Sequence, residues 1–497
     1  MVRSSFVVGL DVGTSSAKAV AIDQDGNVAA SAASAYPTYV VRPGWTEQDP
    51  YDWQNAAFGI LAEIAGKTNG GIEAIGLTGQ MHAATFLDAR DMPIRNALLW
   101  NDQRTAEQAA EIEALIGRER YISITGNGCH TGFQVPKILW VRENEPSRYD
   151  RIASVLLAKD FVRLALCGES ATDVSDASGT GVVDIRTRDY STPLLDVLSI
   201  PKMWLPKIVE SPAVCGAITK RAARTAGVRP GTPIVGGAGD NAAGALGADV
   251  VDPCAMLLSL GTSGVLLSPS VQVRIDPKGA FHAFLHAVPG LTFSSGVTLA
   301  AGGSLAWFRR ILSSDPGLDE PTSTSLTLEA ADSPVGSNGV VFAPYLSGER
   351  APHLDPHVRG AWVGLSTATS RADLTRAVLE GVAFSLRDVL EGLRALGILP
   401  TELRAVGPAC SNPLWRSILC NVLGLPIVLP TIDEGAAFGA AILAAVGAGW
   451  YADVRSASTA LVRFRPLDHH PDADEAARYD ELYLRFIELY PRLHALV

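Results

Sequence analysis

The chain has little positive charge to offer a polyanion. Its 497 residues carry 41 Lys and Arg against 52 Asp and Glu, a formal net charge of −11, and no long basic run interrupts this balance. Nucleic acids and anionic lipid surfaces attract proteins through clustered Lys and Arg. The charge therefore argues against a nucleic-acid partner and against a membrane-surface partner.

Long apolar runs are also scarce. We expect no signal peptide in residues 1–13, because Asp11 interrupts the apolar stretch that begins at Phe6. Residues 435–452 are uncharged, but they consist mostly of Gly and Ala and directly follow Asp433 and Glu434. Small residues let helices approach closely. We therefore interpret this segment as a buried helix packed on a neighbour rather than as a membrane span.

Cysteine is rare and shows no pattern. The six cysteines are scattered, and none forms a CxxC pair, so we expect reduced thiols in a cytoplasmic protein. Two histidine pairs have the spacing of a helical zinc site, His282 with His286 and His353 with His357. The first pair lies in a β-like run and prolines interrupt the second, which argues against a metal-ligand role for either.

What is present is an ordinary globular composition in a long chain. Apolar residues make up 47% and charged residues 19%, and the length exceeds what a single core usually supports. Predicted strands such as 72–79 and 402–407 alternate with predicted helices such as 52–66 and 374–397. We expect layered α/β domains. A last amphipathic helix, predicted over 475–493, would pack back onto the body.

One short motif occurs in both halves. DVGTSSAKAV (11–20) and SLGTSGVLLS (259–268) each place Gly-Thr-Ser between two short apolar runs. Gly13 and Gly261 allow a backbone to approach a ligand, and the N–H groups and hydroxyls that follow can face a phosphate. We predict a duplicated protein with a boundary near 247–253, a cleft between the lobes and a phosphate-facing hairpin in each.

Two aspartates, Asp11 and Asp240, are candidates for metal binding and for proton transfer in this cleft. Asp11 ends the first strand, where a buried carboxylate requires a cation or a set of hydrogen-bond donors. Mg²⁺ fits, because it is commonly held by one or two carboxylates with phosphates and water. Asp240 follows a Gly-rich strand end and opens a helix, so it is either an N-cap or a base that accepts the proton of a substrate hydroxyl. The cleft favours the base. Lys18 points either to a phosphate or to solvent.

The stretch around Asp240 also contains Gly237-x-Gly239-x-x-Ala242, a loose dinucleotide fingerprint. Asp240 occupies the place of the pyrophosphate, which argues against a dehydrogenase. Elsewhere, TGQMHAATF and LLWNDQRT supply donors, acceptors and apolar faces for a polyhydroxylated ligand. The candidates in these two stretches are Gln80, Met81, His82, Trp100, Asn101, Asp102 and Arg104.

The order of these motifs resembles the FGGY family of carbohydrate kinases, and within it the xylulokinase branch. The likeness covers nearly the whole chain, from GLDVGTSSAK and GLTGQMH through LLAKDFVR, SDASGT and GGAGDNAAGALG to LSLGTSGV, YLSGERAPH and EGAAFGAA. It implies an α/β protein with the duplicated actin-like (ribonuclease H-like) ATPase fold, two lobes around a central cleft. Residues 1–250 would hold the sugar and the first phosphate loop, 251–450 the nucleotide side, and 451–497 a helical segment that packs back.

The resemblance also implies a reaction and the residues that perform it. The chain would use ATP and Mg²⁺ in the cytoplasm to phosphorylate a small-molecule sugar, converting D-xylulose to D-xylulose 5-phosphate. The resemblance also allows a homodimer. Asp240 matches the catalytic base. The predicted sugar contacts are Met81, His82, Trp100, Asn101, Asp102, Asp240 and Asn241; the nucleotide and phosphate contacts are Thr14, Ser15, Lys18, Gly261, Thr262, Gly302, Gly407 and Asn412; the metal residues are Asp11 and Asp240.

Two positions depart from the family pattern. Pro408, in VGPACSNPLW, replaces a glycine of the adenosine loop, and proline has no N–H and a fixed φ. We expect weaker ATP binding or another donor. Ala83 stands where xylulokinases carry glycine, so the identity of the preferred sugar is left undecided. The alternatives are a kinase for another pentulose or polyol, or an actin-like nucleotide-binding scaffold with little transfer activity.

Overall fold

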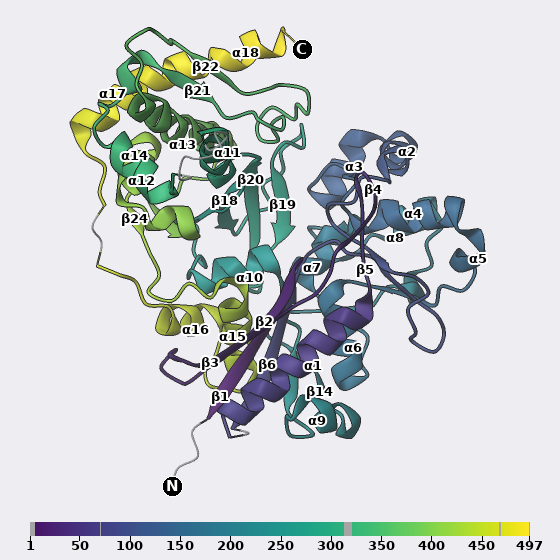
Figure 1. Cartoon of the computed structure of the whole chain (residues 1–497). Coiled ribbons are helices and arrows are strands. Elements are labelled where there is room, and N and C mark those ends of the chain that lie inside the picture. The colour runs from purple at the N-terminus through teal and green to yellow at the C-terminus, as the bar shows by residue number, and fades with distance from the viewer. Residues whose placement is uncertain (1–4, 70, 313–320, 467–468, 497) are drawn as a thin grey trace.

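Two mixed β-sheets, one from each half of the chain, form the framework of the protein (Figure 1). The computed structural model describes residues 5–69, 71–312, 321–466 and 469–496. The first sheet has the order β14-β15-β6-β1-β2-β3, with β16 also paired to β6. Its strands are β1 (Phe6–Val12), β2 (Ser16–Ile22), β3 (Val28–Ala35), β6 (Ile72–Gly79), β14 (Val214–Ala217), β15 (Pro233–Val235) and β16 (Ala238–Gly239).

The second sheet repeats the pairing of the first. Strands β1, β2 and β3 are antiparallel neighbours, and β6 and β15 extend the sheet from β1 in parallel. In the same order, β17, β18 and β20 are antiparallel, and β23 and β24 extend the sheet from β17 in parallel. The strands are β17 (Ala255–Leu260), β18 (Gly264–Ser270), β19 (His282–Leu285), β20 (Thr292–Thr298), β23 (Glu402–Val406) and β24 (Ile427–Val428). The predicted duplication is thus a property of the strand pairing.

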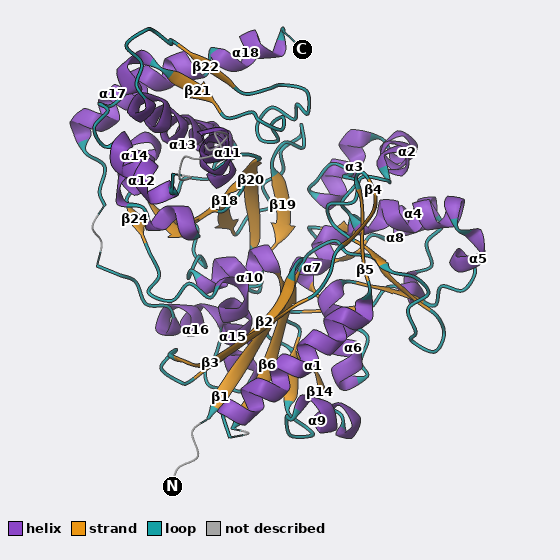
Figure 2. Ribbon diagram, viewed as in Figure 1, coloured by secondary structure: helices purple, strands orange, loops and turns teal. Residues whose placement is uncertain are grey.

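Helices cover both faces of each sheet (Figure 2). Helix α1 (Pro50–Lys67) begins at the N-cap Asp49, which accepts a hydrogen bond from Tyr51 N, and it buries one apolar face on the first sheet. Helix α13 (Arg371–Ala395) begins with a capping box at Ser370 and covers the second sheet. Other covering helices are α6 (Ala158–Cys167), α9 (Lys220–Ala226), α11 (Gly302–Leu312), α12 (Ser323–Ala330) and α14 (Pro413–Leu423).

The remaining face of each sheet is covered by a helix from the other half. Helix α15 (Gly435–Gly447) packs on β1 and β6, and its residues join the core formed by Val7, Val20 and Ile22. Helix α10 (Asp240–Gly247) packs in a core with Leu257 and Leu267 of the second sheet. The two helices cross each other at the centre of the molecule (Figure 1). The expected buried helix in 435–452 is confirmed.

Because α10 and α15 pack so closely, adding a single methyl group at their contact should destabilise the protein. A Cβ at Gly439 of α15 would lie 1.8 Å from the carbonyl oxygen of Ala243 in α10. Because two backbones would have to separate, we expect Gly439→Ala to lower the free energy of unfolding by about 1–3 kcal/mol. Gly59→Ala in α1 is the matched control, since nothing lies within 4 Å of its new Cβ, and it is expected to stabilise by about 0.4–1 kcal/mol. Urea unfolding measures both, and equal effects would contradict close packing at the crossing.

Smaller elements complete the two lobes. The first lobe adds β4 (Tyr39–Arg42), β5 (Trp45–Gln48), β7 (Thr85–Leu87), β8 (Ala97–Leu98), β9 (Ser154–Leu156), β10 (Ala171–Asp173), β11 (Val183–Asp184), β12 (Asp189–Tyr190), β13 (Lys207–Val209), α2 (Ala106–Ile116), α3 (Arg118–Thr125), α4 (Gln134–Asn144), α5 (Pro146–Tyr149), α7 (Val174–Ala177) and α8 (Thr192–Leu198). The second adds β21 (Val341–Ala343) and β22 (Ala361–Val363). Across the described ranges, no helix combines the length and apolarity needed to cross a membrane.

The C-terminal segment lies against both halves. Helix α16 (Val454–Leu461) joins the core beneath α15, while Tyr479 and Phe486 of α17 (Ala473–Phe486) enter the core of the second lobe. The single helix predicted over 475–493 is wrong in one respect, because α17 ends at Phe486 and α18 (Leu489–His494) follows. Pro491 cannot donate a backbone hydrogen bond to a residue four positions earlier, which explains the break.

Candidate active site between the two lobes

The two Gly-Thr-Ser turns close matching hairpins. Gly13 N donates to Ser16 O at 3.1 Å in the first, and Gly261 N donates to Ser263 O at 3.1 Å in the second. The second turn also abuts the start of α11, because Gly302 N donates to Gly261 O at 2.9 Å. The predicted hairpins are therefore confirmed, and each presents a short turn of small residues at the end of its sheet.

The two predicted acids lie at neighbouring strand ends. Asp11 on β1 stands opposite Thr78 of β6, and Ala238 of β16 stands opposite Thr78 on the other side. Asp240, two residues beyond Ala238, begins α10, and its Oδ1 accepts a hydrogen bond from Asn241 N at 2.7 Å. β1 and β16 thus place both carboxylates at one edge of the first sheet.

Their surroundings make both carboxyls weak acids. Burial raises the pKa of Asp11 to about 7, the charge of Asp240 adds to the rise, and Lys18 opposes it. Burial raises the pKa of Asp240 to about 6, against the hydrogen bond from Asn241. The Oδ1 of Asp11 is buried and has no hydrogen-bond partner within the described part of the chain. A second carboxylate nearby and an unpartnered oxygen leave Asp11 short of positive charge.

A buried cluster of charges lies behind the strand end that carries Asp240. Lys159 Nζ lies 2.7 Å from Asp160 Oδ1, 3.0 Å from Asp173 Oδ1 and 3.1 Å from Asp176 Oδ2, with all four side chains at most 1% exposed. The cluster reaches the strand end at two points. Arg163, which pairs with Asp160, donates to Gly236 O, and Gly239 N donates to Ser175 Oγ, which donates in turn to Asp173.

Met81 and His82 lie beside Asp240. Met81 is buried against Gly239, and its sulfur lies 3.6 Å from Asn241 Nδ2. His82 has a φ of 69°, its Nδ1 lies 2.7 Å from Gly179 O, and its ring stacks on Phe133 at 4.8 Å. Burial lowers the pKa of His82 to about 3, so the ring is neutral. Its Nδ1 donates to the carbonyl, which leaves Nε2 as a hydrogen-bond acceptor.

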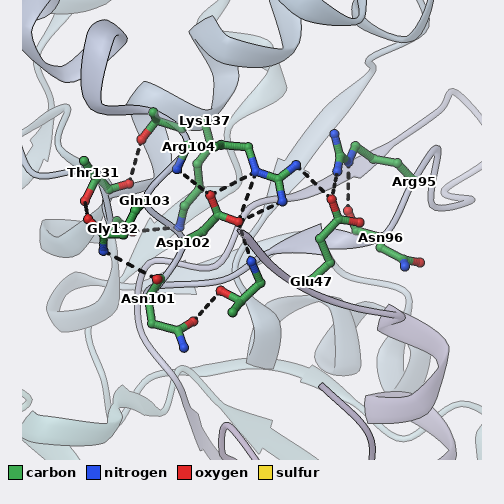
Figure 3. A network of polar contacts seen from close by, with 12 residues as sticks. Glu47, Arg95, Asn96, Asn101, Asp102, Gln103, Arg104, Thr131, Gly132 and Lys137 are labelled. Atoms are coloured by element: carbon green, nitrogen blue, oxygen red, sulfur yellow. Dashed lines mark hydrogen bonds and ion pairs between the residues drawn. The ribbon is translucent and has the colours of Figure 1, made fainter. Parts of the chain in front are cut away.

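Trp100 connects the first hairpin to this region, and Asn101 and Asp102 follow it. Trp100 is 43% exposed, and its Nε1 donates to Thr14 Oγ1 at 3.0 Å. Asn101 Oδ1 accepts from Thr46 Oγ1 at 2.6 Å (Figure 3). Asp102 is 0% exposed, and its oxygens accept from the Arg104 guanidinium and from Thr46 N. Asp102 was predicted to contact sugar; in the structure it is buried, and both of its carboxylate oxygens are bonded within the protein.

The same network holds the backbone on which His82 stands. Arg104 also pairs with Glu47 at 2.8 Å, and its guanidinium lies 4.1 Å from the ring centroid of Trp45. The buried Lys137 donates to Gly132 O at 2.7 Å, as Figure 3 shows, and to His82 O at 2.8 Å. Two loops and the left-handed His82 are thereby fixed to one ammonium group, whose pKa burial holds well below its ordinary value.

The nucleotide candidates of the second lobe gather at one cavity. This cavity, of about 1050 Å³, is lined by Gly261, Thr262, Gly302 and Asn412. Asn412 caps α14 and donates to Thr327 Oγ1 at 2.7 Å. Gly407 adjoins the cavity with a φ of 99°. Further lining residues are Leu260, Leu299, Trp307, Arg310, Ser347, Pro408, Ser411 and Trp415.

Pro408 and Lys18 can now be placed. Pro408 is the first residue of a short 3₁₀ turn, Pro408–Ser411. The first position of such a turn needs no N–H donor, so proline is compatible with the fold of this loop. Lys18 Nζ lies 2.5 Å from Glu434 Oε2, so its charge already has a protein partner. Ser15 is exposed at the tip of the first turn. The first hairpin therefore offers hydrogen-bond donors at Ser15 but little unpaired positive charge at Lys18.

Sequence reasoning missed His130 and considered His282 only as a metal ligand. His130 lies 5.1 Å from the ring of His282, and its buried Nε2 has no partner in the described residues. His282 of β19 lies 2.9 Å from Asn127 Oδ1 and stacks on Phe284. No group of three or more potential metal ligands occurs among the residues described. The histidines therefore form an aromatic, polar wall between the lobes, and nothing in their local sequence signals it.

Comparison with known proteins finds relatives along nearly the whole chain. Residues 6–247 match the N-terminal domain, and residues 256–448 the C-terminal domain, of the FGGY family of carbohydrate kinases. The chain is 36% identical over 490 residues to a xylulose kinase of Escherichia coli, covering 98% of this chain and 99% of the relative.

Solved structures give the same result. A xylulose kinase from Rhodospirillum rubrum is similar with a TM-score of 0.92 at 32% identity, covering 99% of both chains. A gluconate kinase from Lactobacillus acidophilus is similar with a TM-score of 0.93 at 28% identity, covering 99% of this chain and 98% of that one. The sugars in these two names differ in charge, because gluconate carries a carboxylate and xylulose does not.

Proposed function

The chain belongs to the FGGY family of carbohydrate kinases, and we propose that it uses ATP to convert D-xylulose to D-xylulose 5-phosphate. The observation that carries the proposal is the carboxylate of Asp240, which begins α10 at the sheet edge that also holds Asp11 and His82. The xylulose kinases among its relatives support the choice of sugar.

In the proposed reaction Asp240 is the general base. Its carboxylate accepts the proton of the terminal sugar hydroxyl as that oxygen forms a bond to the γ-phosphorus of ATP. The bond from this phosphorus to the β,γ-bridging oxygen breaks, and its electron pair leaves on ADP. A carboxyl with a pKa of about 6 is ionised at neutral pH yet remains a better proton acceptor than an ordinary aspartate.

The donor set at Asp11 fits a divalent cation. Its buried Oδ1 lacks a hydrogen-bond partner in the described residues, and the nearby charge of Asp240 adds to its raised pKa. Both features are relieved by a dication, and we propose that Asp11, with Asp240 close by, holds Mg²⁺ together with phosphate oxygens. When bound, the ion neutralises charge on those oxygens.

Binding of ATP is assigned to the two hairpins and the cavity. Thr14, Ser15 and Thr262 present hydroxyl and backbone donors to phosphates from opposite lobes. The adenosine would occupy the cavity of about 1050 Å³, against Gly302 and Asn412. Gly407 keeps the backbone between the cavity and β17 in a conformation that favours glycine. Lys18 acts in this proposal through its charge near Asp11 rather than as a direct phosphate contact.

The sugar is assigned to the side chains next to Asp240. The neutral His82 offers an acceptor at Nε2, Asn241 and Asn101 offer amide groups, and Met81 and Trp100 offer apolar faces. An uncharged wall suits an uncharged ketose, since a hydroxyl both donates and accepts hydrogen bonds. Asp102 would support this surface from behind by fixing the loop that carries Asn101.

A panel of acceptors tests the function directly. Magnesium-dependent ADP release from ATP is measured with D-xylulose, other ketopentoses, tetritols, glycerol and gluconate. We expect D-xylulose to raise the rate at least about 100-fold above the sugar-free ATPase, because the bound hydroxyl replaces water as acceptor. Preference for another polyol would revise the sugar. ATP binding without stimulation by any acceptor would contradict the kinase proposal and favour the nucleotide-binding scaffold.

A further inference from the structure

Three cations around the site are already engaged within the protein. Lys18 pairs with Glu434 at 2.5 Å, Lys137 donates to two carbonyl oxygens, and Arg104 pairs with Asp102. A phosphoryl group in transfer carries negative charge on three oxygens, and kinases commonly meet it with Lys, Arg and metal. A protein cation for this charge therefore has to be sought elsewhere in the cleft.

Arg350 has the free charge that these residues lack. Its backbone N–H donates to Glu349 Oε1 at 2.8 Å, but its guanidinium makes no hydrogen bond or ion pair with any residue in the described ranges. Arg350 as a whole residue is exposed, yet burial lowers the pKa of its guanidinium, against the charge of Glu349. A partly buried guanidinium without a hydrogen bond or ion pair among the described residues is free to meet an anion.

The main chain at Arg350 is fixed beside the second hairpin. The carboxylate of Glu349 accepts hydrogen bonds from Thr298 Oγ1 at 2.6 Å and from Leu299 N at 2.9 Å. Thr298 is the strand partner of Gly264, which directly follows the second Gly-Thr-Ser turn. On the other side, Ala351 N donates to Val297 O at 3.0 Å. Arg350 is thus held at the strand end nearest to Thr262.

From this anchor the positive charge of Arg350 acts on histidines of both lobes. The pKa values of His82, His130 and His282 are lowered chiefly by burial, and the positive charge of Arg350 contributes to all three shifts. His82 and His130 belong to the first lobe and His282 to the second. Arg350 is therefore anchored beside the second hairpin, and its charge acts on the histidine wall.

We propose that Arg350 binds the oxygens of the phosphoryl group while it passes from ATP to the sugar. The inference rests on the proposed function. The guanidinium donates two parallel hydrogen bonds to the non-bridging oxygens, a geometry that lysine does not offer. Bond making and breaking are those already given: the sugar oxygen gains the phosphorus, ADP leaves with the electron pair, and Asp240 takes the proton. Arg350 gains and loses no covalent bond.

The carboxylate of a sugar acid presents the same pair of oxygens. The similarity to a gluconate kinase makes this a chemical alternative for the same arginine. The two sources differ in what Arg350 controls. A phosphoryl contact is strongest in the transition state and acts on kcat, whereas a carboxylate contact is present in the bound substrate and acts on KM.

The test compares Arg350→Gln and Arg350→Lys with a matched control, Arg221→Gln. Arg221 lies in α9, is exposed and likewise has no partner in the described residues. With the acceptor that the wild type prefers, we expect Arg350→Gln to lower kcat about 10²- to 10³-fold, with the sugar KM changed less than about threefold. Arg350→Lys should retain more activity, and free guanidinium should partly rescue Arg350→Gln. Arg221→Gln should match the wild type, and thermal unfolding of each variant establishes that it is folded.

A second measurement separates this inference from the proposed function. Orthovanadate with MgADP mimics the phosphoryl group in transit, and its affinity can be measured by calorimetry without turnover. We expect at least about tenfold weaker binding by Arg350→Gln. If no sugar stimulates the wild type, the kinase proposal fails while this arm still decides the role of Arg350. Unchanged vanadate binding, a kcat within threefold of the wild type, or a loss confined to the KM for gluconate would each overturn the inference.

Discussion

Replacement of Asp240 by asparagine is expected to lower kcat by roughly 10²- to 10⁴-fold. Asparagine keeps the size of the side chain and its contact with Asn241 N, but it cannot accept the proton of the sugar hydroxyl. ADP release under saturating ATP and sugar measures the loss. Asp196→Asn is the matched control, because Asp196 is exposed on α8, and it should leave kcat unchanged.

The pH dependence distinguishes a base from a binding residue. Only the ionised form of Asp240 accepts a proton, so kcat/KM of the wild type should rise with pH through about 6, the raised pKa of this carboxyl. The asparagine variant should lose this limb of the profile. A variant that keeps more than a tenth of the activity, or that keeps the acidic limb, would contradict the assignment of Asp240 as the base.

Loss of activity in this variant should not reflect loss of structure. Burial raises the pKa of Asp240 in the folded protein, so the ionised form is penalised there relative to the unfolded chain. That cost is fully present at pH 8 and is relieved progressively as pH falls below about 6 toward the ordinary aspartate pKa. Asparagine carries no charge, so its melting temperature at pH 8 should equal or exceed that of the wild type.

Replacement of Lys159 by methionine is expected to lower the free energy of unfolding by about 3–5 kcal/mol. Methionine keeps much of the volume but removes the ammonium group that lies within 3.1 Å of three buried carboxylates. Those carboxylates would then share the charge of Arg163. Urea unfolding at neutral pH measures the change. Lys220→Met, at an exposed position of α9, is the control and should stay within about 0.5 kcal/mol of the wild type.

The deficit caused by Lys159→Met should shrink between pH 8 and pH 5. Burial holds the pKa of Asp176 well above its ordinary value even though the charge of Lys159 opposes the rise. Without the ammonium group the folded protein favours the protonated carboxyl still more, while the unfolded chain ionises it at an ordinary aspartate pKa. Such a cost acts above the unfolded pKa and is relieved as pH falls. A deficit that stays constant over this range would point to lost packing instead.

Features written in short stretches of sequence were predicted successfully. The two hairpins need only Gly-Thr-Ser between apolar runs, and both are present. The α/β class and the duplicated actin-like fold are confirmed by the repeated strand pairing and by the solved structures of related sugar kinases. Strand β6 matches the predicted range 72–79, because alternation and flanking turns determine a strand locally.

Features that depend on distant residues were not predictable. Nothing in the local sequence shows that the Arg104 guanidinium lies over the ring of Trp45 and bonds to Asp102, so the burial of Asp102 was not foreseen. Lys159 was noticed only within a motif, because its three partners come together through two separate segments. Arg350 depends on the meeting of one loop with a strand end and with the histidines of both lobes. Such positions follow from the fold, not from spacing.

The packing of α15 on the first sheet has a consequence for folding during synthesis on the ribosome. Val7, Val20 and Ile22 belong to strands that are synthesised long before the helix that covers them, which is encoded at residues 435–447. Until that helix emerges, the nascent first sheet has to keep one apolar face uncovered. A chaperone that recognises apolar strands would therefore find its binding site early, and release should coincide with the synthesis of α15.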